Sequence, residues 1–306
     1  MKRHKITRKK YILLCFTLML AAVLFLFYGP FSAFRVLWIQ TAMHSTRFRF
    51  LAQLPYSERY ISQVLREHAV STDEKTDLDA VTPSGGDGLQ YAPVQGDLYR
   101  GHLLRIDDPV RLDLVQAGIE EGKLLEDILP PGALHGVNAS GYLQEERRGL
   151  VWGYCYADGV CVNRCDKGEK HTVGGMTMQN KFFVGSLTDE ELRTRQFRWL
   201  VEFGPILIVN GEKVPISQSA GGLCPRTAIG QTKDGAMLLL VVDGRQAKSV
   251  GAGYLDLQTI LYANGAVNAI VLDGGSSSSM VYDKALVNSP SEKDIWRRLP
   301  NALVVR

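Results

Sequence analysis

Short apolar runs separated by polar turns fill most of the chain after residue 94, and they predict a strand-rich domain. Strands are expected at 97–106, 110–115, 134–139, 150–156, 160–162, 203–209, 236–242, 269–272 and 302–305. Asp158-Gly159 between two of these runs is typical of a hairpin, and Asn210-Gly211 of another turn. Short helices interrupt the strands too evenly for an all-β fold, so the predicted class is α+β.

Two helices carry clear sequence signals within this domain. Thr188 followed by Glu191 has the spacing of a capping box, which predicts a helix that starts just after Thr188. Further along, apolar residues recur on one helical face, and Gly265 follows the last of them. The residues on that face are Tyr254, Leu257, Ile260 and Leu261.

The N-terminal region has the pattern of a membrane anchor. Residues 11–28 contain no charge and are nearly all apolar, which is about the shortest length that spans a bilayer as a helix. Lys9 and Lys10 end a basic cluster before this run, so the positive-inside rule predicts a cytoplasmic tail at 1–10 and a single-pass protein with the rest outside. A cleaved signal peptide is the alternative, because a basic start and an apolar stretch fit both.

Residues 29–94 are predicted to form a stalk. Tyr60, Ile61, Val64 and Leu65 have helical spacing, which predicts a juxtamembrane helix over 57–70 with Ser57 as its N-cap. Residues 71–88 are polar and include a Gly-rich stretch, which is typical of a flexible segment. The domain boundary is therefore expected near Val94, with the domain at 95–306.

The charge balance gives no sign of a nucleic-acid partner. The net charge is +3, but the first ten residues hold six Lys and Arg and no acid. The remaining chain has 29 basic and 32 acidic residues, so its net charge is −3. A nucleic-acid-binding surface needs a basic patch on the folded part, and the composition shows none.

The cysteines leave their chemistry open. Cys155, Cys161 and Cys165 lie close in sequence, Cys224 stands apart, and Cys15 lies in the apolar segment. Outside the cell disulfides are allowed, and sequence alone cannot choose among the pairings of the last four. Disulfides or free thiols are expected. A zinc site with His171 is a weaker alternative, because the spacing matches no established zinc pattern.

The stretch 272–279 is the strongest candidate for a functional site. An apolar run, Ala269 to Leu272, is followed by Asp273, two glycines and four serines. The Gly274-Gly275 step allows positive φ, and successive N–H groups in such a turn can bind an anion. A flexible Gly/Ser linker is the alternative.

Other apolar strands also end in polar clusters. These clusters begin at Asn138, Arg226 and Asp243, and the last of them includes Arg245. Loops carried on rigid strands are where binding groups concentrate. Two carboxylates, two guanidiniums and an amide would suit an anionic, oxygen-rich ligand, since Arg binds phosphate in a bidentate fork.

Each of these residues also has a structural interpretation. Asp243-Gly244 is a common turn, Arg226 could pair with a surface acid, and Asn138 could satisfy a turn backbone. His102, His135 and His171 lack catalytic spacing, so structural or surface roles are expected for them. Motifs of the common serine hydrolases, NTPases and metalloproteases are absent from the sequence.

An ordered set of motifs resembles the phosphodiester glycosidase family over residues 95–306. The motifs are Phe203-Gly204-Pro205, Asn210-Gly211, Pro225-Arg226-Thr227-Ala228-Ile229-Gly230, Val242-Asp243-Gly244-Arg245, Ala266-Val267-Asn268-Ala269, Leu272-Asp273-Gly274-Gly275-Ser276-Ser277 and Asn301-Ala302-Leu303-Val304-Val305. Two places depart from the family pattern. Asn138-Ala139-Ser140-Gly141-Tyr142 stands where an Asn-Gly-Gly-Phe-like turn is usual, and serines replace a third glycine after Gly275.

The resemblance implies cleavage of a sugar-1-phosphodiester in cell-envelope or secreted polysaccharide. Phosphate is a good leaving group, so the reaction needs cationic or N–H stabilisation of phosphate and a carboxylate near the sugar. The expected assignments place Asp273 as the carboxylate, Asp243 as its partner or as an orienter of Arg245, and Asn138 on a sugar hydroxyl. The expected phosphate or sugar contacts are Arg226, Arg245 and the loop residues Gly274, Gly275, Ser276 and Ser277.

Three points stay open at this stage. Sugar transfer to another acceptor is an alternative to hydrolysis, and a non-catalytic protein that binds anionic glycan is the competing class. No cofactor is predicted, although Asp243 and Asp273 could share a hard cation such as Ca²⁺. The sequence does not identify a metal.

Overall fold

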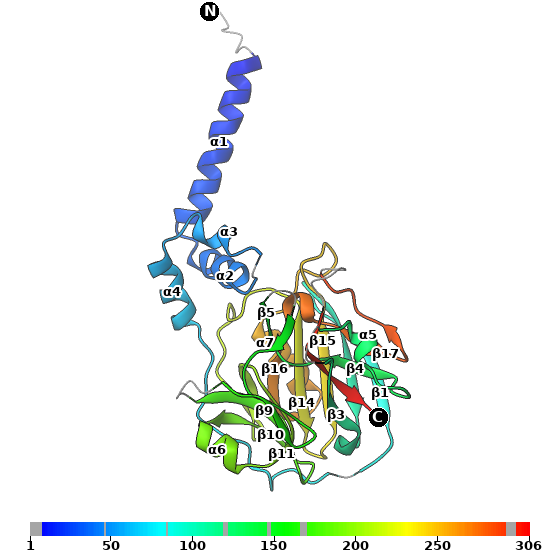
Figure 1. Cartoon of the computed structure of the whole chain (residues 1–306). Coiled ribbons are helices and arrows are strands. Elements are labelled where there is room, and N and C mark those ends of the chain that lie inside the picture. Colours follow the sequence, from blue (N-terminus) through cyan, green and yellow to red (C-terminus); the bar gives the residue numbers. More distant parts are fainter. Residues whose placement is uncertain are drawn as a thin grey trace, which may run out of the picture. The chain divides into compact units, whose positions relative to one another are not determined.

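The computed structural model describes residues 8–45, 47–83, 85–118, 122–145, 148–165, 170–291 and 298–306 (Figure 1). The chain divides into two compact units, residues 1–67 and 68–306. The second unit is a mixed, strand-rich α+β domain, which confirms the predicted fold class.

The first unit consists of helices in its described part. They are α1 (Arg8–Tyr28), α2 (Ser32–Met43), α3 (Phe50–Gln53) and α4 (Glu58–Glu67). Helix α1 includes the candidate span Lys9–Tyr28, none of which is buried, so its length and composition suit a membrane anchor or a signal sequence. Helix α4 begins where predicted, and the Ser57 hydroxyl accepts from the Tyr60 N–H at 3.4 Å.

The segment predicted as a stalk has a small core of its own. Side chains from α2, α3 and α4 are buried against one another, among them Ile39, Ala42, Ala52, Ile61 and Val64. The sequence prediction found only α4, because α2 directly follows the apolar anchor and has no distinct polar break before it. This region is therefore a compact helical unit in its own right.

In its described residues, the second unit contains three larger antiparallel sheets and a separate two-stranded sheet. The seven-stranded sheet has the order β1 (Leu89–Gln95), β2 (Arg100–Ile106), β15 (Met237–Val242), β14 (Arg226–Thr232), β16 (Ala266–Leu272), β12 (Ile206–Val209), β13 (Glu212–Lys213). One five-stranded sheet has the order β10 (Phe182–Leu187), β9 (His171–Thr177), β11 (Phe197–Glu202), β7 (Cys155–Ala157), β8 (Val160–Asn163). The other has the order β18 (Ala285–Leu286), β17 (Met280–Tyr282), β4 (His135–Asn138), β19 (Asn301–Val305), β3 (Leu112–Gln116). Strands β5 (Tyr142–Glu145) and β6 (Arg148–Val151) pair with each other.

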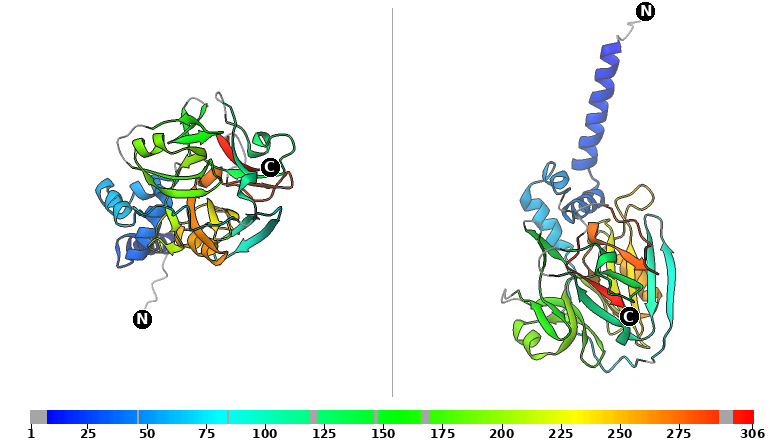
Figure 2. Two further views of the ribbon diagram at one scale, coloured as in Figure 1. Left: turned by 90° about the horizontal axis from the view of Figure 1, so that it is seen from below. Right: turned by 45° about the vertical axis from the view of Figure 1, so that its right-hand side comes forward.

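Short helices complete this unit (Figure 2). They are η1 (Pro109–Arg111), α5 (Leu125–Ile128), α6 (Asp189–Thr194), α7 (Tyr254–Ala263) and η2 (Gly275–Ser277). The predicted capping box of α6 is confirmed, because Thr188 and Glu191 each bond the other's backbone N–H. Helix α7 ends before Gly265, which has a φ of +85°, as predicted.

The predicted turns have the backbone that their residues favour. Asp158 and Gly159, between β7 and β8, have φ values of 50° and 77°. Asn210 and Gly211, between β12 and β13, have values of 53° and 84°. Positive φ at both central residues matches the right-handed twist of the flanking strands, so both connections are tight hairpins.

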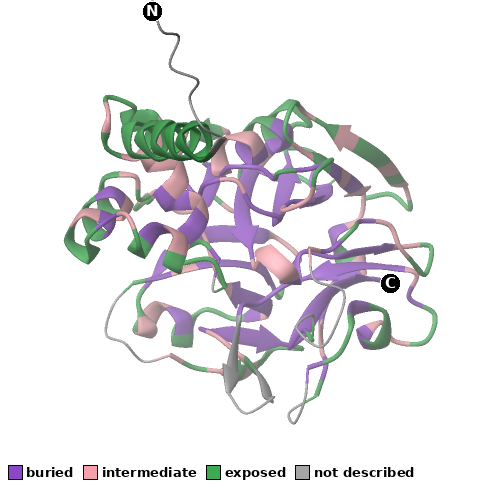
Figure 3. Ribbon diagram, turned by 90° about the horizontal axis from the view of Figure 1, so that it is seen from above, coloured by how far each residue is buried: buried purple, intermediate pink, exposed green. Residues whose placement is uncertain are grey.

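The main core lies between the three larger sheets. Ile229 and Leu239 from the seven-stranded sheet belong to the same buried cluster as Trp199 from β11 and Leu303 from β19. Figure 3 shows these strands as buried ribbon, with exposed residues on the outer helices and loops. A second cluster lies between α7 and the opposite face of the seven-stranded sheet, and it includes Leu257.

The second unit begins earlier than the predicted boundary near Val94. Strand β1 pairs along its whole length with β2, and the N–H of Thr76 bonds the carbonyl of Val184 at 3.0 Å. Lys75 forms an ion pair with Glu191 at 2.5 Å. Residues 71–88 looked like a linker because they attach to the domain mainly through main-chain and charged groups. Their apolar contacts are isolated, such as the buried Val81 and the partly buried Leu78, so no hydropathy pattern marks them.

All five cysteines lie in the described part of the chain, and each is a free thiol. Burial raises the pKa of the Cys155 thiol to about 11, so this sulfur stays protonated and unreactive. Among the described residues, no three His, Cys, Asp or Glu side chains gather as metal ligands. The zinc alternative therefore gains no support.

Gln258 on α7 provides a test of this packing. Its buried amide donates to the carbonyl of Leu207 at 2.7 Å and to that of Val214 at 2.8 Å. Gln258→Leu leaves the Val214 carbonyl without this donor, while the Leu207 carbonyl keeps the Val214 N–H at 3.0 Å, and it should lower the free energy of unfolding by about 2 kcal/mol. Thr259→Ala, on the exposed side of the same helix, should change it by less than about 0.5 kcal/mol. The free energies of unfolding are measured by chemical denaturation in detergent solution, and equal values for the two variants would contradict this account.

Candidate active site

Three strand ends that the sequence singled out meet in one place. The N–H of Asp273, after β16, bonds the carbonyl of Ala139, after β4, at 3.1 Å. The N–H of Gly275 bonds the carbonyl of Pro225, just before β14, at 2.9 Å. The polar residues at the ends of β4, β14 and β16 therefore form one cluster, although they lie far apart in the chain.

Asn138 joins these strand ends from within the core. Its side chain is fully buried, and its Nδ2 donates to the main-chain carbonyl of Asp273 at 2.6 Å. Its Oδ1 accepts from the Thr227 hydroxyl at 2.7 Å and from the Ser279 N–H at 3.1 Å. The predicted contact with a sugar hydroxyl is therefore wrong, because this amide lies beneath the surface and serves the backbone.

The stretch 273–279 is an ordered turn that the protein packs tightly. Ser277, Ser278 and Ser279 are buried, and η2 begins at Gly275, which has a φ of +65°. A Cβ on Gly274 would lie 3.0 Å from the Pro225 carbonyl oxygen, so the turn needs glycine there. The linker interpretation is excluded by this packing.

The N–H groups of the turn are mostly occupied within the protein. The N–H of Gly274 and the hydroxyl of Ser277 donate to the Asp273 carboxylate. The N–H of Gly275 donates to the Pro225 carbonyl. The N–H of Ser277 bonds the Gly274 carbonyl at 3.3 Å. The N–H groups of Gly274 and Gly275 are therefore not available for the predicted phosphate contact, and Ser276 is partly exposed, as both glycines are.

Asp273 is the partly exposed carboxylate of the cluster. Burial raises its pKa to about 6, while the bonds from Ser277 and Gly274 and the charge of Arg226 act in the opposite direction. A carboxylate in this range is ionised at neutral pH yet close enough to neutrality to accept a proton.

Arg226 lies beneath this carboxylate. Its side chain is only 5% exposed, and its guanidinium carbon lies 4.5 Å from the centre of the Tyr254 ring. Nε donates to the carbonyl of Ala252 at 3.4 Å, and Nη2 donates to the carbonyl of Gly221. Arg226 is a buried cation whose charge acts on Asp273, so pairing with a surface acid is excluded.

Arg245 lies on the open side of the turn and is partly exposed. A Cβ built on Gly275 would lie 3.4 Å and 3.5 Å from its two terminal nitrogens, so the guanidinium rests directly against Gly275. The residue has a φ of 58°, and its N–H bonds the carbonyl of Val250 at 2.9 Å. Of the two predicted arginines, Arg245 is the one placed to meet a ligand from outside.

Asp243 holds neighbouring residues in position through hydrogen bonds and does not take part in catalysis. Its Oδ1 accepts from Asn288 Nδ2 at 3.0 Å and from the Ser289 N–H at 2.9 Å, and the side chain is buried. Burial raises the pKa of this carboxyl, and the two hydrogen bonds partly offset that. Asn288 also donates to the Ser278 carbonyl at 3.0 Å, so Asp243 fixes the far side of the turn through it.

Two aromatic residues adjoin the segment that follows β4: Trp152, which the sequence did not single out, and Phe203 of the Phe203-Gly204-Pro205 motif. The N–H of Trp152 bonds the carbonyl of Gly141 at 2.8 Å, and its ring lies 6.4 Å from that of Phe203, at 75°. Both rings are partly exposed. Trp152 and Asn288 each follow a short apolar run and carried no motif, so nothing in the sequence marked them.

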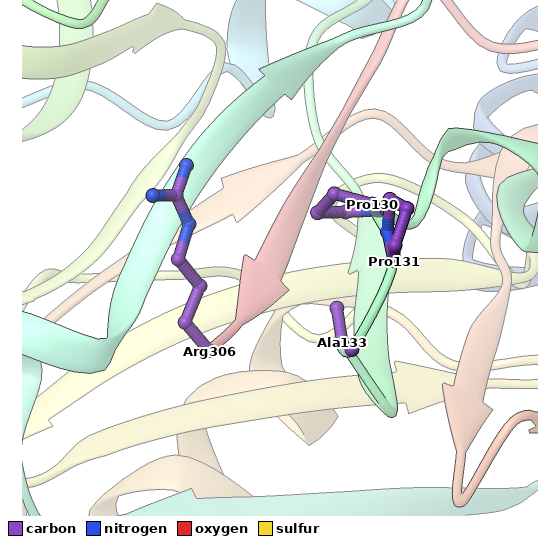
Figure 4. A pocket seen from close by; sticks show the side chains of 5 residues that line it. Pro130, Pro131, Ala133 and Arg306 are labelled. Carbon is purple, nitrogen blue, oxygen red and sulfur yellow. The ribbon is translucent and has the colours of Figure 1, made fainter.

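His171, His135 and the described pocket lie outside this cluster, whereas His102 is close enough to Asp243 for the two charges to act on each other's pKa. His171 is buried between Glu202 and Asp189, each 3.1 Å from a ring nitrogen, and His135 accepts from the Asp283 N–H at 3.1 Å. The pocket of about 380 Å³ in Figure 4 is lined by Pro130, Pro131, Gly132, Ala133 and Arg306. It lies at the His135 end of β4, because Val305 pairs with His135 while Ala302 pairs with Asn138.

Comparisons with known proteins agree with the predicted family. The phosphodiester glycosidase family model matches residues 131–306. The N-acetylglucosamine-1-phosphodiester alpha-N-acetylglucosaminidase of Mus musculus is 25% identical over 231 residues, which are 66% of this chain and 44% of the mouse protein. The uncharacterized SPbeta prophage-derived protein YomE of Bacillus subtilis is 38% identical over 68 residues, which are 22% of this chain and 11% of that protein.

A solved structure shares the fold. It is the zebrafish N-acetylglucosamine-1-phosphodiester alpha-N-acetylglucosaminidase catalytic domain, auto-inhibited by pro-peptide, with a TM-score of 0.61 and 20% identity. The match covers 82% of this chain and 93% of that one. The chain spans less than half the length of the curated relatives it matches.

The raised pKa of Asp273 makes a testable contribution to stability. The folded protein holds the Asp273 proton up to about pH 6, whereas the unfolded chain loses it near its ordinary value of 3.8. Stability should therefore fall by about 1–3 kcal/mol through this group as the pH rises from about 4 to 6. Asp273→Asn removes the titrating group, so the wild-type stability should fall relative to the variant over this interval. Parallel melting-temperature profiles for the two proteins would contradict the assignment.

Proposed function

The chain belongs to the phosphodiester glycosidase family, and from that premise we propose that it hydrolyses a sugar-1-phosphodiester. The observation that carries the proposal is Asp273, a partly exposed carboxylate with a pKa raised to about 6. It lies on a turn fixed by buried hydrogen bonds, next to Arg226 and Arg245. A rigid acid beside cationic groups is what cleavage of an anionic glycoside requires.

The reaction breaks the bond between C1 of the sugar and the phosphate oxygen. The phosphate monoester leaves with the electron pair, and water adds to C1 to give the free sugar. Asp273 stabilises the positive charge that develops at C1 and accepts the proton released by the attacking water. Because phosphate leaves readily, the site functions without a second carboxylate acting as general acid. Asp243 therefore has a structural role, as the acceptor of the hydrogen bonds from Asn288 and Ser289.

The two arginines have different tasks in this proposal. Arg245 binds the phosphate from the open side of the turn and stabilises its growing charge. Arg226 is buried below and lowers the pKa of Asp273, which keeps this carboxylate ionised at neutral pH. The buried guanidinium of Arg226 keeps Asp273 in its ionised, active form, while the guanidinium of Arg245 contacts the ligand.

The substrate class follows from the family and from the predicted location. The mouse relative is named for an N-acetylglucosamine-1-phosphodiester, so we take this linkage as the first candidate. The 20-residue span in α1 supports a membrane anchor in this proposal, and the basic residues before it favour a cytoplasmic N-terminus. The domain then faces glycans outside the membrane, such as phosphate-linked envelope or secreted polysaccharide.

Transfer of the sugar to another acceptor is the second enzymatic outcome, and it would use the same Asp273. A protein that only binds anionic glycan would keep its affinity when Asp273 is replaced. The pKa of Asp273 favours an enzyme over such a binder, because raising a carboxylate's pKa weakens its use as a fixed charge but suits proton transfer.

Asp273→Asn gives the direct test of this function. Purified full-length protein in detergent should release sugar from N-acetylglucosamine-1-phosphodiesters, and the variant should lower kcat by at least about 10²-fold. Asp283→Asn is the matched control, because Asp283 is exposed in the β17–β18 turn and its φ of 50° suits Asn. Wild-type rates from folded Asp273→Asn, or no release across a panel of sugars, would reject the proposal.

A further inference from the structure

We infer that Trp152 and Phe203 form the wall on which the sugar ring of the substrate packs. This inference rests on the proposed function, and it adds the apolar half of the site. The two aromatic residues come from different parts of the chain, one before β7 and one after β11. Both are partly exposed, and Phe203 also packs against the buried cluster beneath α7.

The wall rests on the segment after β4, which is hydrogen-bonded to the turn that holds Asp273. A Cβ on Gly141 would lie 3.2 Å from Cε2 of Phe203 and 3.6 Å from Cε3 of Trp152, so both rings rest on this glycine. Gly141 is two residues beyond Ala139, whose carbonyl accepts the Asp273 N–H. Two residues span at most about 7 Å, so the wall lies on the backbone that directly continues from the hydrogen bond between Ala139 and Asp273.

The geometry suits a pyranose. One face of a pyranose ring is a set of C–H groups, and burying it against an aromatic face removes apolar area from water. The rings of Trp152 and Phe203 meet at 75°, so they form a corner that contacts a sugar ring and one of its substituents together. The charged groups of the site then bind the phosphate, and the aromatic corner binds the sugar.

Substitutions of these residues should change KM more than kcat. Trp152→Ala should raise KM for the cleaved phosphodiester at least about tenfold, and Trp152→Phe should restore most of the affinity because it keeps an aromatic face. Phe203→Leu keeps a side chain of similar size without the ring, and it should raise KM at least about threefold. Tyr262→Ala is the control, because Tyr262 is an exposed aromatic residue on α7 whose ring contacts Lys213.

Failure of this inference is distinguishable from failure of the proposed function. Wild-type cleavage with an unchanged KM in Trp152→Ala and Phe203→Leu would reject the wall alone. Absence of cleavage by the wild type would reject the function, and the wall is then tested by saturation-transfer NMR with methyl N-acetyl-α-glucosaminide. Binding that is lost in Trp152→Ala and kept in Trp152→Phe supports the wall, and equal signals from all three proteins overturn it.

A different observation carries a second inference. We propose that the segment Arg47-Phe48-Arg49-Phe50, together with Leu54, inserts into the headgroup region of an anionic membrane. Leu54 is 78% exposed and Phe50 50% exposed, which is unusual for apolar side chains in a compact helical unit. We call these five residues the Arg-Phe patch.

Hydrogen bonds place this patch at the end of the membrane helix. The Tyr28 hydroxyl donates to the carbonyl of Pro55 at 2.8 Å, and the Tyr56 hydroxyl donates to that of Phe27 at 3.0 Å. Leu54 precedes Pro55 directly, so it lies at the level where α1 ends. If α1 spans the bilayer, as proposed above, the patch lies at the membrane–water interface.

The residue types of the patch fit that position. Aromatic and aliphatic side chains are stable at the depth of the headgroups, and arginines there bind lipid phosphates. Arg47 and Arg49 are exposed, and the Arg47 guanidinium lies 5.9 Å from the centre of the Phe48 ring. Anionic phospholipid is therefore the partner that satisfies the charged and the apolar halves of the patch together.

Fluorescence quenching in vesicles tests the patch in the full chain. One variant carries Leu54→Trp and the other carries Gln63→Trp at an exposed position of α4. Each is placed in phosphatidylcholine vesicles that contain brominated lipid as the quencher. The added Leu54→Trp signal should be quenched at least about twice as strongly as the Gln63→Trp signal. Phosphatidylglycerol should increase that quenching, and Arg47→Gln with Arg49→Gln should remove the increase.

The outcomes separate the anchor from the patch. Protein that sediments with vesicles while Leu54→Trp is no better quenched than Gln63→Trp has an anchor but overturns the patch. An increase with phosphatidylglycerol that survives loss of both arginines overturns its preference for anionic lipid. Protein that does not sediment with vesicles overturns both the anchor and the patch.

Discussion

The buried amide of Asn138 is the interaction on which the site depends. It binds the main chain after β16, a hydroxyl on β14 and the backbone before β17, so it fixes three strands that come from distant parts of the sequence. A buried amide with unsatisfied bonds would cost more than the bonds contribute, so the three segments hold one arrangement. The position of Asp273 follows from that arrangement.

Burial within a fixed turn gives the Asp273 carboxylate its unusual pKa. Gly274 lets the backbone approach Pro225, and Gly275 leaves room for the guanidinium of Arg245. The turn packs closely around Asp273, which raises its pKa to about 6, and the charge of Arg226 prevents a larger rise. Rigidity, close packing and one buried cation together give a group suited to proton transfer at neutral pH.

The sequence predicted the elements whose signals are local. Thr188 and Glu191, Asp158-Gly159 and Gly265 each determine their own stretch of backbone, and the structure confirms all three. The sequence also singled out the ends of β4, β14 and β16 for their polar residues, and the structure brings these ends together. The roles of Asn138, Gly274 and Asp243 were not predictable, because they depend on which distant donors and acceptors satisfy each buried polar group. The attachment of residues 71–88 was missed for the same reason.

Oxygen labelling tests the central claim that the protein breaks the bond at C1 of a sugar phosphodiester. The full-length protein is incubated with an N-acetylglucosamine-1-phosphodiester in ¹⁸O-water, and the released phosphate monoester is observed by ³¹P NMR. The account predicts unlabelled phosphate and ¹⁸O at C1 of the sugar, because water adds to carbon. Phosphate that carries the ¹⁸O label would show attack at phosphorus and would contradict a glycosidase.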